Sequence, residues 1–374
     1  MNRLKELERF GQSVWLDYIR RSLLIGGGLQ TLIRDDGVKG LTSNPAIFEK
    51  AIAGGGEYQA PLAAAARLGE TDAQPIYERI AIEDIRMAAD QMQPVFEATG
   101  GRDGFVSLEV SPKLAHDTGH TVLEAHRLWS AVARPNLMIK VPATPAGLPA
   151  FEQLIADGVN VNVTLLFSVE MYARVAEAYL RGLERRASAN EPVDALASVA
   201  SFFVSRIDTE IDARLEEKAG RAASETERGR LLRLRGRAAI ANAKIAFARY
   251  QAIFSGARWD SLAARGARTQ RLLWASTSAK NADYPDTMYV DGLIGPDTVN
   301  TIPPATLDAF RDHGRPEATL ARDLAGAKAT LAEIAAAGVS LDAATDKLLG
   351  DGVRLFAEAF DRLLDAVSRA RKAA

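Results

Sequence analysis

Cysteine is absent from the 374-residue sequence, and histidine occurs only four times. Without thiols the chain can form no disulfide, thiolate metal site or cysteine nucleophile, and its composition is compatible with a reducing compartment. His116 and His120 have the spacing of a helical metal pair, but the sequence offers no third ligand, and a zinc site needs at least three. We therefore expect no metal site.

An excess of charge of one sign is also absent, because 46 basic residues stand against 48 acidic ones and leave a net charge of -2. Proteins that bind nucleic acid usually carry a clear positive excess, so this partner is disfavoured. No apolar run approaches the ~18 to 20 residues that span a bilayer, and the charged first ten residues lack the apolar core of a signal peptide. We expect a cytoplasmic protein without a membrane partner.

Nucleotide-binding and serine-hydrolase motifs are missing as well. The glycine triplets at 26–28 and 54–56 lack the spacing of a dinucleotide fingerprint or a P-loop, so we interpret both as loops. No G-x-S-x-G segment is present, and no histidine lies beside a strand-end serine, which disfavours a serine triad.

Short apolar runs rich in β-formers do occur, and they alternate with longer segments of helical period, a pattern typical of β/α proteins with a parallel sheet. Eight such runs predict a closed (β/α)8 TIM barrel with its reactive groups at the C-terminal ends of the strands. A ninth segment, 287–290 (T-M-Y-V), fits a strand and a short helix equally well. The eight predicted strands are 13–17, 38–42, 105–110, 137–141, 159–165, 197–203, 271–276 and 298–302.

Additional helices are predicted around the barrel. Residues 208–253 have helical spacing broken near Gly220 and Ser224, and beyond Pro316 the pattern is helical only. Phe356 and Phe360 belong to an apolar stripe of the last segment, which predicts a docked amphipathic helix on the barrel wall or over its mouth. We expect one domain over residues 1–374, with the C-terminal helices starting from about residue 316.

Lys140 interrupts an apolar run, N-L-M-I-K-V-P-A-T, that otherwise has the character of a strand buried on both faces. Lysine is almost never wholly buried unless it is paired or used. Burial can lower its pKa from about 10.4 by roughly 3 to 5 pH units, which gives an amine able to attack a carbonyl. The alternative is a lysine that ends the strand and pairs with a carboxylate.

Polar residues recur at or just beyond the ends of the predicted strands. Within the fifth strand, Asn160, Asn162 and Thr164 share one face at period two. That face belongs either to an active site or to a core network in which the three side chains satisfy one another. The strand-end residues are Asp17, Asn44, Glu109, Lys140, Thr164, Ser201 and Ser276.

Several segments together resemble transaldolase, in the longer bacterial form of that family, and they follow the family's order from near residue 11 almost to the C-terminus. The family has an eight-stranded β/α barrel, in agreement with the strand count. The matching segments are V-W-L-D at Asp17, G-L-T-S-N-P at Asn44, S-L-E-V at Glu109, N-L-M-I-K-V-P-A-T at Lys140, G-V-N-V-N-V-T-L-L-F-S at Asn162 and Thr164, S-F-F-V-S-R-I-D at Ser201 and Arg206, and F-A-E-A-F-D-R-L-L-D-A.

The resemblance implies transfer of a three-carbon dihydroxyacetone unit in the non-oxidative pentose phosphate pathway. The donor would be sedoheptulose 7-phosphate or fructose 6-phosphate, and the acceptor glyceraldehyde 3-phosphate or erythrose 4-phosphate. A protonated imine on Lys140 would serve as the electron sink, so that no metal or organic cofactor is needed.

The resemblance also implies a role for each matching residue. Asp17 would move the proton of the hydroxyl whose deprotonation breaks the carbon–carbon bond, while Glu109 and Thr164 would hold a water for imine formation and hydrolysis. The sugar-binding residues would be Asn44 and Asn162 at the hydroxyls, with Thr42 and Ser201 lining the same pocket.

For the phosphate, Arg206 suits bidentate binding, and Ser276 is similar to the family's serine after the seventh strand. The sequence departs from the family there. Shorter transaldolases have A-S-F-R-N at this point and this chain has A-S-T-S-A-K-N, so Lys280 would take the place of the arginine, two residues displaced. Phe202, where a proline is common, is a second departure.

Three alternatives remain open. The same lysine could serve an aldolase that releases free dihydroxyacetone, the barrel could bind sugar phosphates without catalysis, or the chain could be half of a fusion with a sugar-phosphate isomerase, for which it offers no extra domain. Small-molecule sugar phosphates are the expected partners, and we expect a monomer or homodimer.

Overall fold

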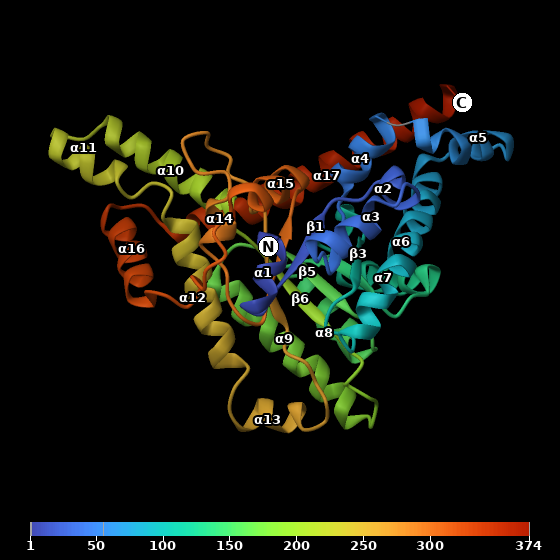
Figure 1. The fold of residues 1–374 in the computed structure, drawn as a ribbon, viewed down its shortest axis with the longest axis horizontal. Helices are drawn as coiled ribbons and strands as arrows, with labels where there is room; N and C mark the ends of the chain where they lie inside the picture. Colours follow the sequence, from blue (N-terminus) through green and yellow to red (C-terminus); the bar gives the residue numbers. More distant parts are fainter. Residues whose placement is uncertain (1, 55, 374) are drawn as a thin grey trace.

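Eight parallel strands close into a barrel in the computed structural model, which describes residues 2–54 and 56–373 (Figure 1). Closure is completed by β1, which pairs with β2 on one side and β8 on the other. The predicted (β/α)8 fold is therefore confirmed. The strands are β1 (Gln12–Asp17), β2 (Gly40–Thr42), β3 (Phe105–Glu109), β4 (Leu137–Pro142), β5 (Val161–Leu166), β6 (Ser198–Phe203), β7 (Arg271–Ala275) and β8 (Thr298–Ile302).

Helices surround this barrel, and those that follow β3, β4 and β5 each return the chain to the start of the next parallel strand. The longer helices are α1 (Arg3–Arg9), α4 (Pro45–Gly54), α5 (Gln59–Arg67), α6 (Ala73–Ala98), α7 (Thr118–Val132), α8 (Gly147–Ala156), α9 (Val169–Ser188), α10 (Ser205–Gly220), α11 (Glu225–Leu232), α12 (Ala238–Ile253), α13 (Ala257–Ala263), α15 (Pro304–His313), α16 (Leu324–Ala336) and α17 (Leu341–Ala373). The short ones are α2 (Arg21–Ile25), α3 (Gly28–Thr31), η1 (Leu32–Asp36), η2 (Gly56–Tyr58), η3 (Pro112–Leu114) and α14 (Met288–Asp291).

The strand boundaries differ little from the predicted ones, and β2 is the shortest strand. It begins at Gly40, where the indole of Trp15 lies so close that a Cβ would come within 2.6 Å of the ring, so only glycine fits. At 287–290 the structure has the short helix α14, so the helical alternative is correct. Of the predicted loop at 54–56, Gly55 lies outside the described residues.

The C-terminal segment forms one helix, α17, which packs mainly on α4 and also touches α6, α10 and β5. In Figure 1 it runs along the upper side of the barrel from the α10 side to the α4 and α5 side. Gly352 of α17 lies against Leu165 of β5, and Phe356 reaches the cavity at the barrel mouth. Of the two predicted positions, the helix therefore occupies the mouth.

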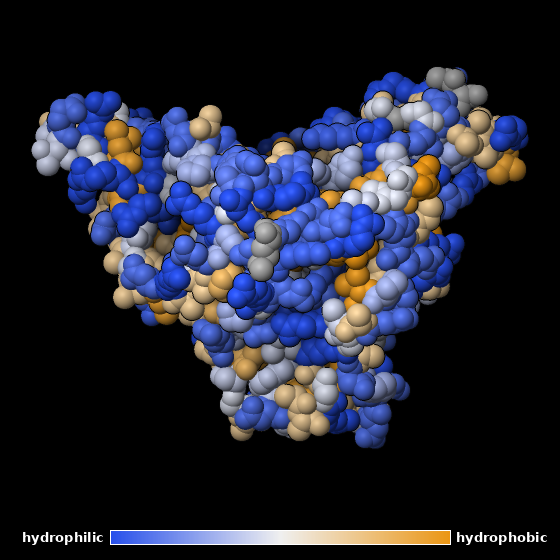
Figure 2. Space-filling model, in the orientation of Figure 1, coloured by the Kyte–Doolittle hydropathy of each residue, from blue (hydrophilic) through white to orange (hydrophobic). Residues whose placement is uncertain are grey.

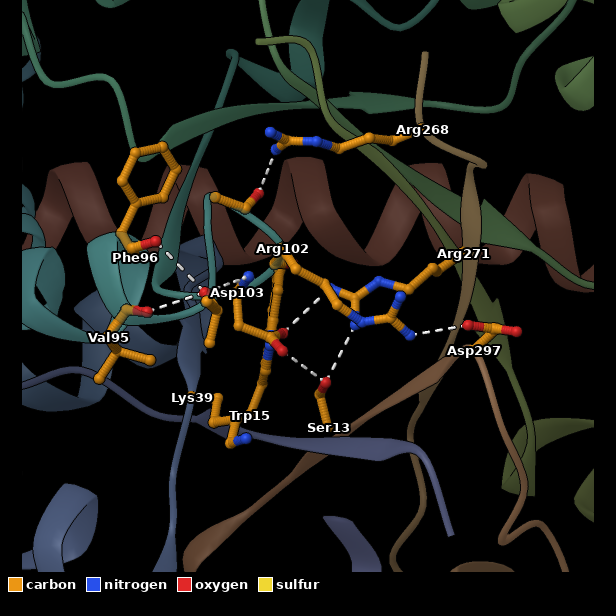
Figure 3. Close-up of polar contacts among 12 residues, drawn as sticks. Ser13, Trp15, Lys39, Val95, Phe96, Arg102, Asp103, Arg268, Arg271 and Asp297 are labelled. Carbon is orange, nitrogen blue, oxygen red and sulfur yellow. Dashed lines mark hydrogen bonds and ion pairs between the residues drawn. The ribbon is translucent and has the colours of Figure 1, made fainter. Parts of the chain in front are cut away.

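The opposite end of the barrel holds a buried polar cluster around Asp103 (Figure 3). Its carboxylate accepts hydrogen bonds from Ser13 Oγ at 2.7 Å and Trp15 Nε1 at 3.0 Å, and it forms an ion pair with Arg271 at 3.0 Å. Because both charged side chains are less than a tenth exposed and mutually satisfied, this cluster fills the N-terminal end of the barrel without leaving an unpaired charge.

The molecular surface is hollowed between two projecting arms, one formed by α10 and α11 and the other by α4 and α5 (Figure 2). Among the described residues, no single helix has the length and apolarity needed to cross a membrane. One bent pair, α16 with α17 at 90°, passes that test on length and composition only.

Candidate active site

A cavity of about 520 Å³ opens at the C-terminal ends of the strands, where the barrel fold predicts reactive groups. Glu109 and Asn162 are the two predicted site residues that lie behind its wall instead of lining it, and each contacts residues of the wall. The predicted residues that line the cavity are Asp17, Thr42, Asn44, Lys140, Thr164, Ser201, Arg206, Ser276 and Lys280.

Lys140 reaches this cavity from β4 with a side chain that is only 6% exposed. Its Nζ donates a hydrogen bond of 3.0 Å to the carbonyl of Ser43, in the turn after β2. The register of the sheet sets Glu109 of β3 directly beside Lys140, and their charged atoms lie 3.7 Å apart. The amine is therefore both near a carboxylate and open to the cavity, so the two sequence interpretations of Lys140 do not exclude each other.

The Glu109 oxygen nearest to the Lys140 amine, Oε2 at 3.7 Å, is buried, and it has no hydrogen-bond partner among the described residues. Burial raises the pKa of Glu109 to about 7, against the lowering effect of the Lys140 charge, while the negative charge of Asp17 adds to the rise. A carboxyl group with this pKa can both accept and return a proton near neutral pH.

Asp17 occupies the end of β1, and its partner in the parallel register is Thr42 of β2. The Thr42 hydroxyl donates a 2.7 Å hydrogen bond to Asp17 Oδ1 and also lies 2.7 Å from the hydroxyl of Thr301. Burial raises the pKa of Asp17, while the charge of Lys140 and the Thr42 hydrogen bond oppose that rise. Asp17 is thus a second carboxyl group, held in a more polar environment than Glu109.

The polar side chains of β5 divide between two uses. Asn162 accepts a 2.7 Å hydrogen bond from Ser201 and donates one of 3.1 Å to Ser107. Thr164 lines the cavity, and its buried hydroxyl has no hydrogen-bond partner among the described residues. Asn160 instead bonds the backbone at Pro135. Thr164 therefore lines the cavity and Asn162 supports its wall through Ser201, whereas Asn160 ties neighbouring strands together.

The outer part of the cavity is cationic. Arg206 at the start of α10 and Lys280 after β7 form no ion pair with a carboxylate in the described part of the chain; the guanidinium lies 5.2 Å from the ring centre of Phe203, and the amine donates to Ser278 at 2.6 Å. Ser276 adds a hydroxyl from a left-handed backbone position, φ 56°. Unpaired cations with hydroxyl groups beside them suit a phosphate.

Several residues of the cavity wall have no counterpart among the sequence predictions. Lys50 lies on a helix, where a charge normally indicates only a solvated face, so no sequence signal marks it, whereas Phe356 belongs to the apolar stripe predicted for the last helix. Thr301 could have been predicted, because it lies next to the C-terminal end of the eighth strand. The remaining new wall residues are Tyr18, Ala46, Ile47, Phe203, Ala275, Ser278, Pro303, Pro304 and Ala305.

Comparison with known proteins agrees with this geometry. Residues 14–367 match the family model described as Transaldolase/Fructose-6-phosphate aldolase. A protein of Thiobacillus denitrificans named Transaldolase is 50% identical over 97% of this chain and 99% of its own length. Proteins of the same name from Trichodesmium erythraeum and Thermobifida fusca are 46% and 47% identical over 98% of this chain and 97% of their own lengths.

Proposed function

The chain belongs to the transaldolase/fructose-6-phosphate aldolase family and is a transferase of that family, and we propose that it transfers a dihydroxyacetone unit through an imine on Lys140. The donor is sedoheptulose 7-phosphate or fructose 6-phosphate, and the acceptor is glyceraldehyde 3-phosphate or erythrose 4-phosphate. The proposal includes a place in the non-oxidative pentose phosphate pathway and in the cytoplasm, with which the cysteine-free composition is compatible.

The first step is attack of the Lys140 amine on the ketose carbonyl carbon. A C–N bond forms, the carbonyl oxygen leaves as water after protonation, and a protonated imine remains. The support for this role is the position of Nζ, which is held by the Ser43 carbonyl and borders the cavity. An adjacent general base is one way in which a nucleophile is activated, and the Glu109 carboxyl group, 3.7 Å from this amine, can take the proton that the ammonium must lose.

Cleavage begins when the hydroxyl group on C4 of the ketose loses its proton. Asp17 takes that proton, the C3–C4 bond breaks, its electron pair moves into the protonated imine to give an enamine, and the aldose phosphate departs. An incoming aldose phosphate reverses these steps, with Asp17 returning the proton. The support is the position of Asp17 on the cavity wall, where the charge of Lys140 acts on it.

Water addition and removal at the imine carbon need a separate acid–base group. We assign this role to Glu109, with the Thr164 hydroxyl orienting the water, because each has a buried oxygen without a hydrogen-bond partner among the described residues, Glu109 beside Lys140 and Thr164 on the same cavity wall as Lys140. Two carboxyl groups in different environments can be given different tasks in this way.

The remaining side chains hold the sugar phosphate. Asn44 and Asn162 would bind the dihydroxyacetone hydroxyls, with Thr42 and Ser201 beside them. Arg206, Ser276 and Lys280 would bind the phosphate, because they form the cationic outer part of the cavity.

The observation that carries this proposal is the Lys140 amine, 3.7 Å from Glu109 in a cavity with unpaired cations at its outer end. Reduction with borohydride in the presence of fructose 6-phosphate should convert the imine into a stable amine. We expect a three-carbon adduct in the peptide of residues 136–144, located on Lys140 by mass spectrometry.

The matched control is Lys140→Met, which keeps the length of the side chain but removes the amine. This variant should acquire no adduct and retain no measurable transfer, while its circular dichroism spectrum stays that of the wild type. No adduct on the wild-type protein, or an adduct on a different lysine, would contradict the proposed mechanism.

A further inference from the structure

Lys50 is a third cation of the cavity wall, and no sequence motif or family resemblance assigns it a role. It lies on α4, five residues after Pro45, the first residue of this helix. Its exposed side chain borders the same cavity as Arg206 and Lys280. Its neighbour Glu49 pairs instead with Arg362 of α17 at 3.3 Å. Lys50 itself forms no ion pair or side-chain hydrogen bond with any described residue, so its amine remains available to a ligand.

The cations of the outer wall differ in their distance from the strand ends. Arg206 is half-buried in the first turn of α10, which begins two residues after β6 ends, whereas Lys50 is exposed in the second turn of α4. Lys50 therefore lies farther from the strand ends than Arg206, and its charge acts on the neighbouring amine of Lys280, whose pKa it helps to lower.

The phosphate groups of the proposed substrates lie at two different distances from Lys140, and the site must bind both. With the first three carbons fixed at Lys140, the phosphate of a seven-carbon ketose lies one carbon–carbon bond, about 1.5 Å, beyond that of a six-carbon ketose. The same difference separates four-carbon from three-carbon acceptors. A guanidinium fork has a fixed geometry, whereas an ammonium on a flexible stem can follow a group that changes position.

We propose that Lys50 binds the phosphate of the longer substrates, the seven-carbon ketose phosphate and the four-carbon aldose phosphate. Arg206 and Lys280 bind the phosphate at the shorter distance and Lys50 extends the site outward. This inference rests on the function proposed above. It makes Lys50 a determinant of substrate length, which the reacting residues cannot be, because they contact only the carbons common to all substrates.

The test compares Lys50→Met with the wild-type enzyme in steady-state transfer in both directions. We expect the KM for sedoheptulose 7-phosphate and for erythrose 4-phosphate to rise about tenfold or more, as for loss of a charge-assisted hydrogen bond. The KM for fructose 6-phosphate and for glyceraldehyde 3-phosphate should rise less than threefold. Lys50→Arg should recover most of the loss, because it restores the charge.

The control variant is Lys328→Met on α16, which removes one exposed charge away from the cavity and should change no KM. An equal rise in KM for long and short substrates in Lys50→Met, or no rise for either, would overturn the assignment. If the wild-type enzyme transfers no three-carbon unit between these substrates, the proposed function fails. If it does so and Lys50→Met behaves like the wild type, only the role of Lys50 fails.

Discussion

Glu109 and Asp17 are two carboxyl groups with different surroundings. The Thr42 hydroxyl donates a hydrogen bond to Asp17 and so favours its ionised form, whereas Glu109 Oε2 accepts no hydrogen bond from the described residues and has the Lys140 amine 3.7 Å away. Burial raises the pKa of Glu109 to about 7, so this group changes its protonation state near neutral pH. It follows that Glu109 should set the acid limb of the pH–rate profile.

For the wild-type enzyme we expect kcat/KM to rise with pH up to about 7 and then level off, because Glu109 accepts a proton only when ionised and ionises as pH passes its pKa. In Glu109→Gln the amide cannot ionise. The limb near pH 7 should disappear, and kcat/KM at pH 8 should fall by about 10² to 10⁴, the usual contribution of a general acid or base. Initial rates between pH 5.5 and 9 measure both effects.

Glu124 provides the control for this variant. Its side chain is half-buried and its pKa is raised as well, but it accepts a hydrogen bond from the Ser111 amide, two residues beyond β3, and does not line the cavity that holds Lys140. Glu124→Gln should leave the limb in place. A limb that persists in Glu109→Gln, or that disappears in Glu124→Gln, would show that a different group titrates there.

For single residues, the sequence predicts the location of a side chain in the fold better than it predicts which side chains are in contact. The apolar run around Lys140 indicates its burial, and the strand ends indicate which side chains share one end of the barrel. The pairing of Lys140 with Glu109 depends on a register between β3 and β4 that neither strand encodes alone. Lys50 could not be found from sequence, because one lysine on an amphipathic helix has the same pattern whether it faces water or a cavity.

Among the secondary structure elements, α17 is predicted by its sequence as a docked helix, but its place on the barrel is not. Its apolar spacing predicts a docked helix, and Leu363 and Val367 are indeed fully buried. The choice between wall and mouth depends on Gly352, which allows the helix to approach Leu165 of β5. Leu165 itself has a left-handed backbone, φ 64°, directly after Thr164. Such a contact between distant segments has no signature in either one.

Two glycines of α17 allow this docking to be tested. Gly350 has open space around its Cα, whereas a Cβ at Gly352 would come within 2.9 Å of the Leu165 side chain. Gly350→Ala should stabilise the protein by about 0.5 to 1 kcal/mol, because alanine favours the helix. Gly352→Ala has the same gain in propensity but must displace Leu165 or the helix, so we expect a net loss of about 1 to 2 kcal/mol.

Urea unfolding measures the stability difference between these variants, and steady-state kinetics measures its effect on the site. Since Leu165 adjoins Thr164, Gly352→Ala should also lower kcat/KM several-fold, whereas Gly350→Ala should not. Equal stability for the two variants would mean that the helix does not depend on this close approach.

On the scale of the whole molecule, the two ends of the barrel serve different purposes. Among the described residues, buried side-chain oxygens without a hydrogen-bond partner occur at both ends, at Glu109 and Thr164 on the C-terminal side and at Gln12 and Gln270 on the N-terminal side. The N-terminal end carries the cluster of Asp103 with Arg271, Ser13 and Trp15, in which the carboxylate is fully engaged (Figure 3). Because the Asp103 cluster lies at the end of the barrel opposite the candidate site, we expect it to contribute to stability.

Asp103→Ala should therefore lower stability without changing catalysis. Leaving the buried Arg271 charge unpaired is expected to cost about 3 to 5 kcal/mol. The matched control is Arg102→Ala, which breaks an ion pair with Asp297 whose side chains are both 50% exposed, and it should cost less than about 1 kcal/mol. Urea midpoints measure both losses.

The KM values and kcat of folded Asp103→Ala at 25 °C should stay within twofold of the wild type. A large change in KM would mean that the two ends are coupled.

We also propose that residues 1–374 form one domain, so that fluorescence and activity should be lost together in a single unfolding transition. Two separate transitions would contradict this.

The pairing of β1 with β8 joins residues such as Gln12 and Thr298, which are 286 positions apart in the chain. During synthesis at about 5 to 20 residues per second, roughly 15 to 60 s pass between the emergence of the two strands. Throughout that interval β1 has an open edge, which is a template for pairing with other chains. The first strand, which carries Asp17, thus depends on the last one, and a nascent chain must be protected from aggregation before it can become an enzyme.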